Sequence, residues 1–342
     1  MTAPSHRSGL ALCRALYDDV VAPRLRGRSH AAAVLGPGSE VLGFDSARST
    51  DHDWRARVTI LVGEANPEPL EGLPATYGGS PVEVAVAELG AHLTAWLGFD
   101  PTQGIDLLDW LLTPTQSLLS VTAGAVFHDT SGDLTAVRER LAWYPPDVWL
   151  WLLAGQWQRI SQVAPFPGRA AEAGDELGSR LLSAELVHDV MRLCFLIERR
   201  HAPYSKWFGS AFARLRSGVR LAPLMEAAVA GADHAAREEA LVGAYRAVGE
   251  AFNALKLTAP IDPEPTRFHD RPFLVPPAEA FAGACAAAID PGSALAGASP
   301  LLGGIDQFVD STELLGHRPE LCRRLSVLYS DAVAGRTVPG ST

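Results

Sequence analysis

Two aspartates on either side of a histidine form the group of residues most suited to chemistry. Asp51 and Asp53 stand just before the run 57–62, whose aliphatic and β-branched residues predict a buried strand. On a strand, residues i and i+2 project to one face, so both carboxylates point one way and His52 points the other. Two nearby carboxylates repel each other unless a cation lies between them, and Mg²⁺ takes carboxylate, water and phosphate oxygens. The pair therefore predicts a Mg²⁺ site for a phosphorylated substrate.

A glycine-rich turn precedes that pair. The apolar run 30–35 predicts a buried strand, and the Gly-Pro-Gly-Ser run 36–39 predicts a tight turn after it. The dinucleotide pattern GxGxxG fails at Val41, and the phosphate-loop pattern fails at Phe44, where lysine is needed. Backbone N–H groups and a serine hydroxyl at the start of a helix still suit phosphate oxygens. The turn and the acid pair together predict a site for a Mg²⁺–nucleoside triphosphate.

A third pattern fits the whole segment: Gly-Ser after a strand, a glycine four residues beyond the serine, and an acid-x-acid pair at the next strand. It resembles the nucleotidyltransferase superfamily, which includes antibiotic nucleotidyltransferases, CCA-adding enzymes and minimal nucleotidyltransferases. The resemblance implies ATP or another nucleoside triphosphate with Mg²⁺ on the aspartates, and nucleotide contacts from the Gly-Ser turn and from the serine before the acid pair. The matched residues are Gly38, Ser39, Gly43, Ser49, Asp51 and Asp53.

The same resemblance implies a third carboxylate on a neighbouring strand, which completes the metal site and accepts the proton of the attacking hydroxyl. Glu83 is the candidate, because it is the only acid in the run 82–86, whose alternation predicts a strand. A solvated residue at a sheet edge is the alternative. Asp45 is a weaker candidate for a metal ligand and equally suits a turn cap.

Most of the chain beyond about residue 88 shows helical periodicity, after an N-terminal helix expected at 9–22. We expect an α+β protein: a small α/β nucleotidyltransferase domain with a mixed sheet over 1–130, and a larger all-helical domain over 131–342 that faces the nucleotide cleft. Loops are expected at 63–81, at 164–175 and in the Pro-rich stretch 258–278. The expected helices are 134–142, 146–162, 176–201, 203–216 and 234–257.

The helical half carries its own candidate residues around Pro203, which should end one helix and start another. Lys206 would neutralise phosphate charge, and Tyr204 would donate a hydrogen bond to phosphate. The alternative is a solvated charged turn with Trp207 in the core. The chain as a whole resembles an uncharacterised bacterial family in which a nucleotidyltransferase domain precedes a helical domain of unknown function. The segments that carry this resemblance are GFDSARSTDHDW at 43–54, YPPDVW at 144–149, APYSKWFG at 202–209 and GGIDQFVDST at 303–312.

One position departs from that family. Arg55 stands where glycine is expected, and it either adds a cation to the cleft or points outward.

The acidic stretch 306–312 either borders the acceptor site or caps a helix. His128-Asp129 and His269-Asp270 lack the GxSxG serine elbow of a hydrolase, so structural hydrogen bonds are the simpler interpretation for both pairs.

The composition of the chain limits the classes of partner that we expect it to bind. The 342 residues include 29 Lys+Arg and 39 Asp+Glu, a net charge of -10, which argues against DNA or general RNA binding. The four cysteines have no zinc or disulfide spacing, and we expect them to be reduced and buried. No stretch reaches the ~20 apolar residues of a membrane span, and no signal peptide is evident, so we expect no membrane contact and a cytoplasmic location.

The sequence thus predicts a Mg²⁺-dependent nucleotidyltransferase that transfers AMP from ATP to a hydroxyl of a small aminoglycoside- or sugar-like acceptor and releases pyrophosphate. Two alternatives stay open. One is a nucleotide-binding regulator, or a toxin–antitoxin-like protein, with little turnover. The other is transfer of AMP to a protein or RNA.

Overall fold

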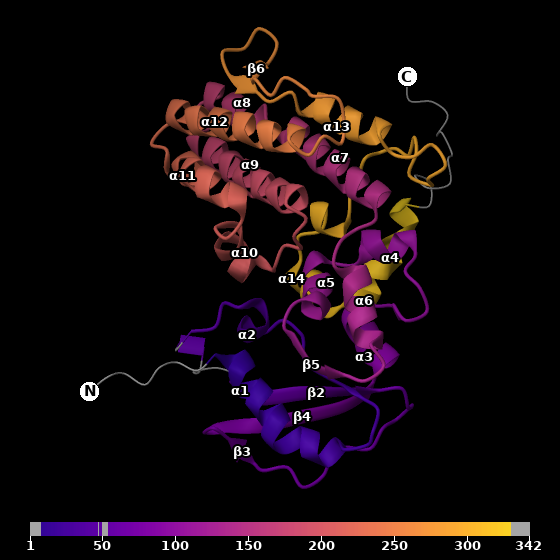
Figure 1. Cartoon of the computed structure of the whole chain (residues 1–342). Helices are drawn as coiled ribbons and strands as arrows, with labels where there is room; N and C mark the ends of the chain where they lie inside the picture. The colour runs from indigo at the N-terminus through magenta and orange to yellow at the C-terminus, as the bar shows by residue number, and fades with distance from the viewer. Residues whose placement is uncertain (1–7, 47, 50–53, 330–342) are drawn as a thin grey trace, which may run out of the picture. The chain divides into compact units, whose positions relative to one another are not determined.

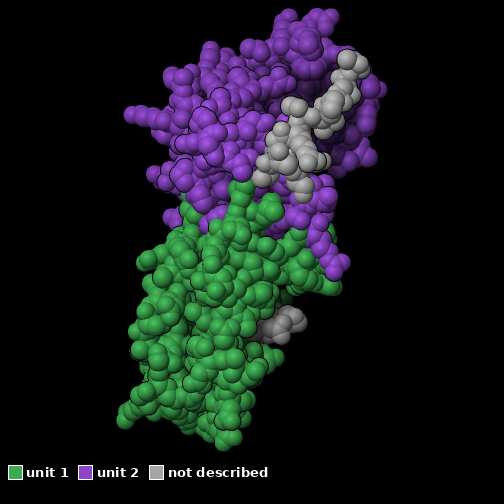
Figure 2. All heavy atoms as spheres, turned by 90° about the vertical axis from the view of Figure 1, so that its right-hand side faces the viewer, with its two compact units in different colours: residues 1–109, 113–143, 311–323 green, residues 110–112, 144–310, 324–342 purple. Residues whose placement is uncertain are grey.

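The computed structural model describes residues 8–46, 48–49 and 54–329. Asp51 and Asp53 therefore lie outside the described residues. The chain forms two compact units (Figure 2). The first comprises residues 1–109, 113–143 and 311–323, and the second comprises 110–112, 144–310 and 324–342. The predicted domain limits, 1–130 and 131–342, stay a prediction.

The first unit is built on a five-stranded mixed sheet with the order β3-β4-β2-β1-β5 (Figure 1). β1 runs antiparallel to both β2 and β5, whereas β2 and β4 are parallel. A mixed sheet beside a helical part confirms the predicted α+β class. The strands are β1 Ala31–Val34, β2 Ala56–Val62, β3 Thr76–Tyr77, β4 Ser80–Glu88 and β5 Ala125–Asp129.

One face of this sheet is covered by the N-terminal helix. Val58, Ile60 and Val62 alternate along β2 and pack with Leu12 and Leu16 of that helix in one buried cluster. The alternate residues of β4 join the same cluster. The residues at every second position of the strands and the leucines at helical spacing therefore pack together in one core.

The N-terminal helix follows the expected span 9–22 with a change of winding. It begins as an α-helix, continues through a π-helical turn, and ends in a 3-10 turn that contains Pro23. The helical segments of the first unit, with α4 shared between the units, are α1 Gly9–Leu16, η1 Tyr17–Val21, η2 Ala22–Leu25, α2 Ser39–Leu42, α3 Leu89–Leu97, α4 Leu107–Leu112, α5 Thr115–Thr122, α6 Asp133–Leu141, α14 Thr312–His317 and α15 Pro319–Cys322.

β5 is a strand that helical periodicity after residue 88 does not predict. It pairs with β1 through a bulge: His128 lies opposite Ala32 and Val126 opposite Ala33, which leaves Phe127 as the extra residue. The bulge turns two successive rings toward Tyr17, with centroid distances of 5.9 Å to Phe127 and 6.3 Å to His128. His128 is hydrogen-bonded to the Thr130 hydroxyl at 3.0 Å, and Asp129 accepts from the Thr135 N–H at 2.8 Å, as the structural interpretation of this pair expects.

The second unit is helical apart from a two-stranded hairpin. Its long helices follow the predicted spans 146–162, 176–201 and 234–257 closely. The segments are α7 Pro146–Val163, α8 Phe166–Glu172, α9 Glu176–Ile197, α10 Ser205–Phe212, α11 Arg216–Ala230, α12 His234–Asn253, β6 Thr266–Arg267, β7 Leu274–Val275, α13 Ala278–Ala287 and η4 Ile305–Gln307, with η5 Arg323–Ser326 running from the first unit into this one.

Three details of the helical half differ from the predictions. The expected loop 164–175 contains α8, because proline is tolerated in the first turn of a helix, where its missing N–H leaves no bond unmade. The expected helix 203–216 ends at Phe212, and α11 starts separately at Arg216. The Pro-rich stretch 258–278 carries the β6–β7 hairpin.

α7 is the central helix of the second unit. Its side chains are buried on nearly every face, and it packs against both α9 and α13. Trp157 stacks on Phe281 of α13, with ring centroids 4.4 Å apart. Trp151 donates from its ring nitrogen to the carbonyl of Gly303 at 3.0 Å. The two tryptophans therefore stabilise the position of α7 in this unit through both packing and hydrogen bonds.

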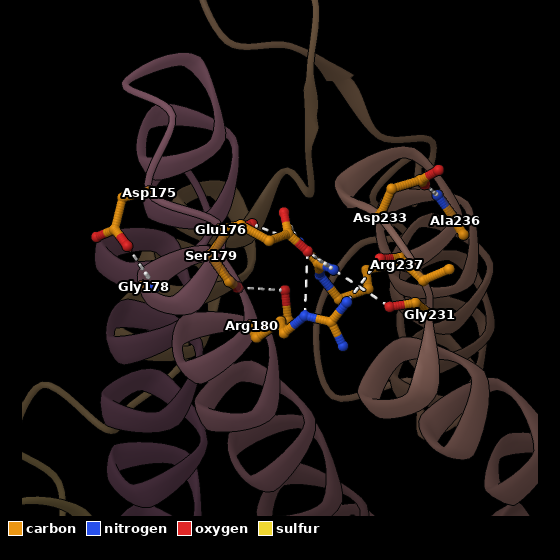
Figure 3. Close-up of polar contacts among 11 residues, drawn as sticks. Asp175, Glu176, Gly178, Ser179, Arg180, Gly231, Asp233, Ala236 and Arg237 are labelled. Atoms are coloured by element: carbon orange, nitrogen blue, oxygen red, sulfur yellow. Dashed lines mark hydrogen bonds and ion pairs between the residues drawn. The ribbon is translucent and has the colours of Figure 1, made fainter.

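A buried arginine ties the start of α9 to the start of α12 (Figure 3). The guanidinium of Arg237 is fully buried and binds both carboxylate oxygens of Glu176, at 2.7 and 3.0 Å. It also donates to the Ser179 hydroxyl at 2.9 Å and to the Gly231 carbonyl at 3.2 Å. Hydrogen bonds from Arg237 lower the pKa of Glu176. One charged side chain thus joins two helix starts.

The cysteines, the helix lengths and two helix caps agree with a folded chain that needs no disulfide within the described residues. All four cysteines are buried, as expected, and none forms a disulfide within the described chain. The chain from 8 to 329, outside its gaps, contains no helix whose length and apolar character would let it cross a membrane. Asp175 and Asp233 cap α9 and α12 by accepting from Gly178 and Ala236 at 2.8 and 2.9 Å.

We predict that Arg237→Ala lowers the free energy of unfolding by about 3 kcal/mol, because it removes four hydrogen bonds and leaves a cavity where a fully buried side chain stood. Urea denaturation followed by circular dichroism measures the loss. Arg246→Ala is the matched control, because Arg246 makes a similar two-bond pair with Glu264 on the surface. Equal losses for the two variants would contradict a special role of Arg237.

Candidate functional site

Strand pairing brings three separate segments to one edge of the sheet. β1 and β2 are antiparallel, with Ala33 opposite Thr59, so the end of β1 lies beside the start of β2. β2 and β4 are parallel, with Arg57 opposite Glu83. The turn 36–39, the first residues of β2 and the first residues of β4 are therefore neighbours. These segments carry Gly38, Ser39 and Glu83.

The turn has the strand–turn–helix form that the sequence predicts. Gly38 precedes α2, and its carbonyl accepts from the N–H groups of Val41 and Leu42 at 3.0 and 3.1 Å. Ser39 is the first residue of the helix, where N–H groups have no intrahelical partner. Gly43 ends the helix with φ 70, a conformation that glycine adopts without strain. The positive φ is therefore a structural reason for glycine at position 43.

Glu40 and Arg57 form a contact at this turn that the sequence does not reveal. The carboxylate of Glu40 accepts from Nε and Nη2 of Arg57 at 2.9 and 2.6 Å. A Cβ added at Gly38 would overlap both carboxylate oxygens of Glu40. The carboxylate therefore lies directly against Gly38, and a side chain at that position would displace it.

Glu83 lies where its alternation predicts. Val82, Val84 and Val86 pack on the face covered by α1, whereas the Glu83 side chain is 53% exposed. Its carboxylate is 3.4 Å from Nε of Arg55. Arg55 therefore lies beside the candidate acid. The role of Glu83 as metal ligand and base stays a prediction, as does the alternative of a solvated acid.

Two neighbouring acidic and hydroxyl residues have structural partners. Asp45 accepts from the backbone N–H of Gly9 at 2.8 Å and so ties this segment to the first residue of α1. Ser49 makes a local turn: its hydroxyl accepts from Ser46 N–H at 3.1 Å, and its own N–H donates to the Ser46 carbonyl at 2.9 Å. The Asp45 contact is a long-range one, and the roles of Asp45 as turn cap or metal ligand stay predictions.

The predicted metal ligands are carboxylates near the start of β2 and β4. Among residues 8–46, 48–49 and 54–329, no three His, Cys, Asp or Glu side chains gather as a group for a metal ion. The predicted set consists of Glu83 and two aspartates, Asp51 and Asp53, that lie outside those ranges. Glu83 fits, since its exposed carboxylate belongs to the oxygen class that Mg²⁺ takes. Its ion pair with Arg55 would have to open.

Tyr204 and Lys206 belong to the second unit. α9 ends at Ile197 and α10 begins at Ser205, so the helix break predicted at Pro203 is confirmed. Tyr204 occupies the position before α10, and the ammonium of Lys206 lies 4.9 Å from the Trp207 ring centroid. Lys206 is exposed. Their contacts with a nucleotide stay predictions.

In the segment 303–312, residues 303–310 belong to the second unit, and 311–312 belong to the first. Gln307 is buried, donates to the Leu152 carbonyl at 2.9 Å and to the Gln156 side chain at 3.1 Å, and accepts from Gly304 N–H at 2.7 Å. At its end, the Ser311 hydroxyl accepts from the N–H of Leu314 in α14 at 3.4 Å. These bonds fit the helix-capping interpretation of this stretch.

A family model described as a domain of unknown function (DUF4037) matches residues 110–208, which run from α4 into α10. No curated protein matches. A solved nucleotidyltransferase-like protein from Exiguobacterium sibiricum 255-15 is similar, with 12% identity and a TM-score of 0.37, over 76% of this chain and 83% of that chain.

We predict that Gly43→Ala destabilises the first unit by about 1 kcal/mol, because φ 70 strains any residue with a Cβ. Chemical denaturation measures the change. Gly283→Ala is the control: Gly283 lies within helix α13 with open space around it, so alanine should be neutral or stabilising there. Destabilisation by both substitutions would contradict the account of the α2 cap.

Proposed function

We propose that the chain is a Mg²⁺-dependent nucleotidyltransferase that transfers AMP from ATP to a hydroxyl group of a small molecule. The observation that supports this most is the sheet edge. A Gly-Ser turn at the start of a helix lies beside the start of β2, just after the Asp51/Asp53 pair in sequence, and the acid Glu83 lies on the adjacent parallel strand. Phosphate and metal-binding groups are needed together for this chemistry.

Asp51, Asp53 and Glu83 would hold the cation. When bound, Mg²⁺ supplies charge neutralisation and aligns the phosphates for in-line displacement. The acceptor oxygen attacks the α-phosphorus of ATP, the bond to the bridging oxygen breaks, and pyrophosphate leaves. The acceptor proton passes to the Glu83 carboxylate, which the exposed position of that side chain permits.

The remaining residues would bind and orient the nucleotide. N–H groups at the start of α2 and the Ser39 hydroxyl would donate to phosphate oxygens, with Gly38 allowing close approach of the backbone. Ser49 would contact the nucleotide next to the acid pair. Lys206 would neutralise phosphate charge, and Tyr204 would donate a hydrogen bond to phosphate.

The acceptor in this proposal is a small, hydroxyl-bearing and preferably cationic compound, such as an aminoglycoside- or sugar-like molecule. A net charge of -10 attracts a cationic compound and repels a polyanionic RNA at long range. Protein or RNA acceptors are the alternatives, and the assay below includes them.

We predict that the wild-type chain, with labelled ATP, Mg²⁺ and a panel of hydroxylated acceptors, releases pyrophosphate and forms labelled adenylylated product. Asp53→Ala should lower the rate at least ~100-fold, because a metal ligand contributes several kcal/mol to the transition state. Glu68→Gln, at an exposed acid of the same unit, is the control and should leave the rate unchanged.

The outcomes separate the functional alternatives. ATP binding without product for any acceptor would favour the nucleotide-binding regulator, and label on protein or RNA would favour the third alternative. Binding and turnover that do not depend on Asp51 and Asp53 would contradict the proposed site altogether.

A further inference from the structure

Two arginines and two glutamates lie together at the start of β2. Arg57 lies in β2, and Arg55 directly precedes that strand. Glu83 lies opposite Arg57 on the parallel neighbour strand and within 3.4 Å of Arg55. Glu40 reaches Arg57 from α2. Each positive charge is therefore balanced by a carboxylate of this chain.

The two ion pairs differ in exposure. The Arg55 and Glu83 side chains are 48% and 53% exposed, so solvent screens their pair. The Arg57 and Glu40 side chains are 26% and 16% exposed, and Arg57 donates twice to a single carboxylate oxygen. Arg57 is thus the more deeply placed cation and the one more firmly held.

The partner of Arg57 lies where an incoming anion would meet the turn. The Glu40 carboxylate contacts Gly38 so closely that a Cβ there would overlap it. A Cβ at Gly36 would lie 3.8 Å from Nη1 of Arg57 and 3.5 Å from the Trp96 ring, so Arg57 also borders the first half of the turn. The guanidinium of Arg57 therefore lies beside the turn 36–38. The Glu40 carboxylate now occupies two of its hydrogen-bond donors.

Resting on the proposed function, we propose that Arg57 is a triphosphate-binding residue and that Glu40 competes with the nucleotide for it. A guanidinium binds phosphate oxygens through two donors in fixed geometry, as it now binds the Glu40 oxygen. When a triphosphate arrives, Arg57 exchanges the carboxylate for phosphate, and Glu40 turns away from Gly38. Apparent affinity is lower than intrinsic affinity by the fraction of molecules in which Arg57 is free.

The test uses two substitutions that break the same ion pair. Binding of inorganic triphosphate, without metal, is measured by isothermal titration calorimetry on the full chain at fixed ionic strength. Arg57→Gln should weaken binding at least ~10-fold, because it removes charge-assisted hydrogen bonds. Glu40→Gln should tighten binding roughly fivefold, because it releases the guanidinium. A carboxylate that competes with the nucleotide for Arg57 predicts effects of opposite sign, whereas a purely structural ion pair predicts no change in affinity from either substitution.

Control variants correct for the change in net charge. Arg246 and Glu264 form a two-bond pair in the second unit, at 2.7 Å for each bond, so Arg246→Gln and Glu264→Gln change the charge equally without touching the turn. Both should leave triphosphate affinity within about twofold of wild type. Tighter binding by Glu40→Gln cannot arise from misfolding, so the proposal stays testable if Arg57→Gln proves unstable.

A purely structural pair predicts another result: both substitutions lower the thermal unfolding midpoint and neither shifts triphosphate affinity beyond the controls. That outcome would overturn the proposal. So would changes of triphosphate affinity that have the same sign in both variants, or the absence of triphosphate binding by both the wild type and Glu40→Gln. AMP transfer that persists in such a case would leave the nucleotidyltransferase function standing. Opposite shifts without AMP transfer would support the role of Arg57 and contradict the proposed reaction.

Discussion

The pairing of β2 with its two neighbours is the constraint on which the candidate site depends. β1 is antiparallel to β2 and β4 is parallel to it, so the end of one strand and the starts of two others fall at one edge. Segments near residues 38, 57 and 83 become neighbours by this pairing alone. A register shift of one residue would move Glu83 to the face covered by α1, among valines that are packed there. The buried alternation of β2 and β4 therefore specifies the position of the polar residues as firmly as that of the core.

Charge is the second feature of this edge. Two arginines stand where polyphosphate would bind, and both are paired with glutamates of the same chain. Such pairs spare the free protein an uncompensated cation next to a turn, at the expense of affinity for an anionic ligand. The same arrangement links Glu83 to Arg55, since the carboxylate that would accept a proton is the one that Arg55 contacts. Nucleotide binding in this account is an exchange of internal ion pairs for phosphate contacts.

Local patterns account for what the sequence could predict. The strands at 30–35, 57–62 and 82–86, the turn, the long helices and the exposed position of Glu83 follow from periodicity and from glycine and proline placement, which depend on neighbouring residues. β5 could not be predicted in this way, because its pairing with β1 joins distant parts of the chain through a bulge. Glu40–Arg57 and Glu176–Arg237 escaped prediction for a related reason. Charged residues are mostly exposed, and an ion pair between distant segments shows no local pattern that distinguishes it.

The most direct measurement of the central claim is a crystal structure of the chain with Mg²⁺ and a non-hydrolysable ATP analogue. The account predicts a metal ion bounded by carboxylates of Asp51, Asp53 and Glu83, with triphosphate oxygens at the turn of Gly38 and Ser39. A nucleotide ordered elsewhere on the molecule, with Glu83 still paired to Arg55, would contradict it.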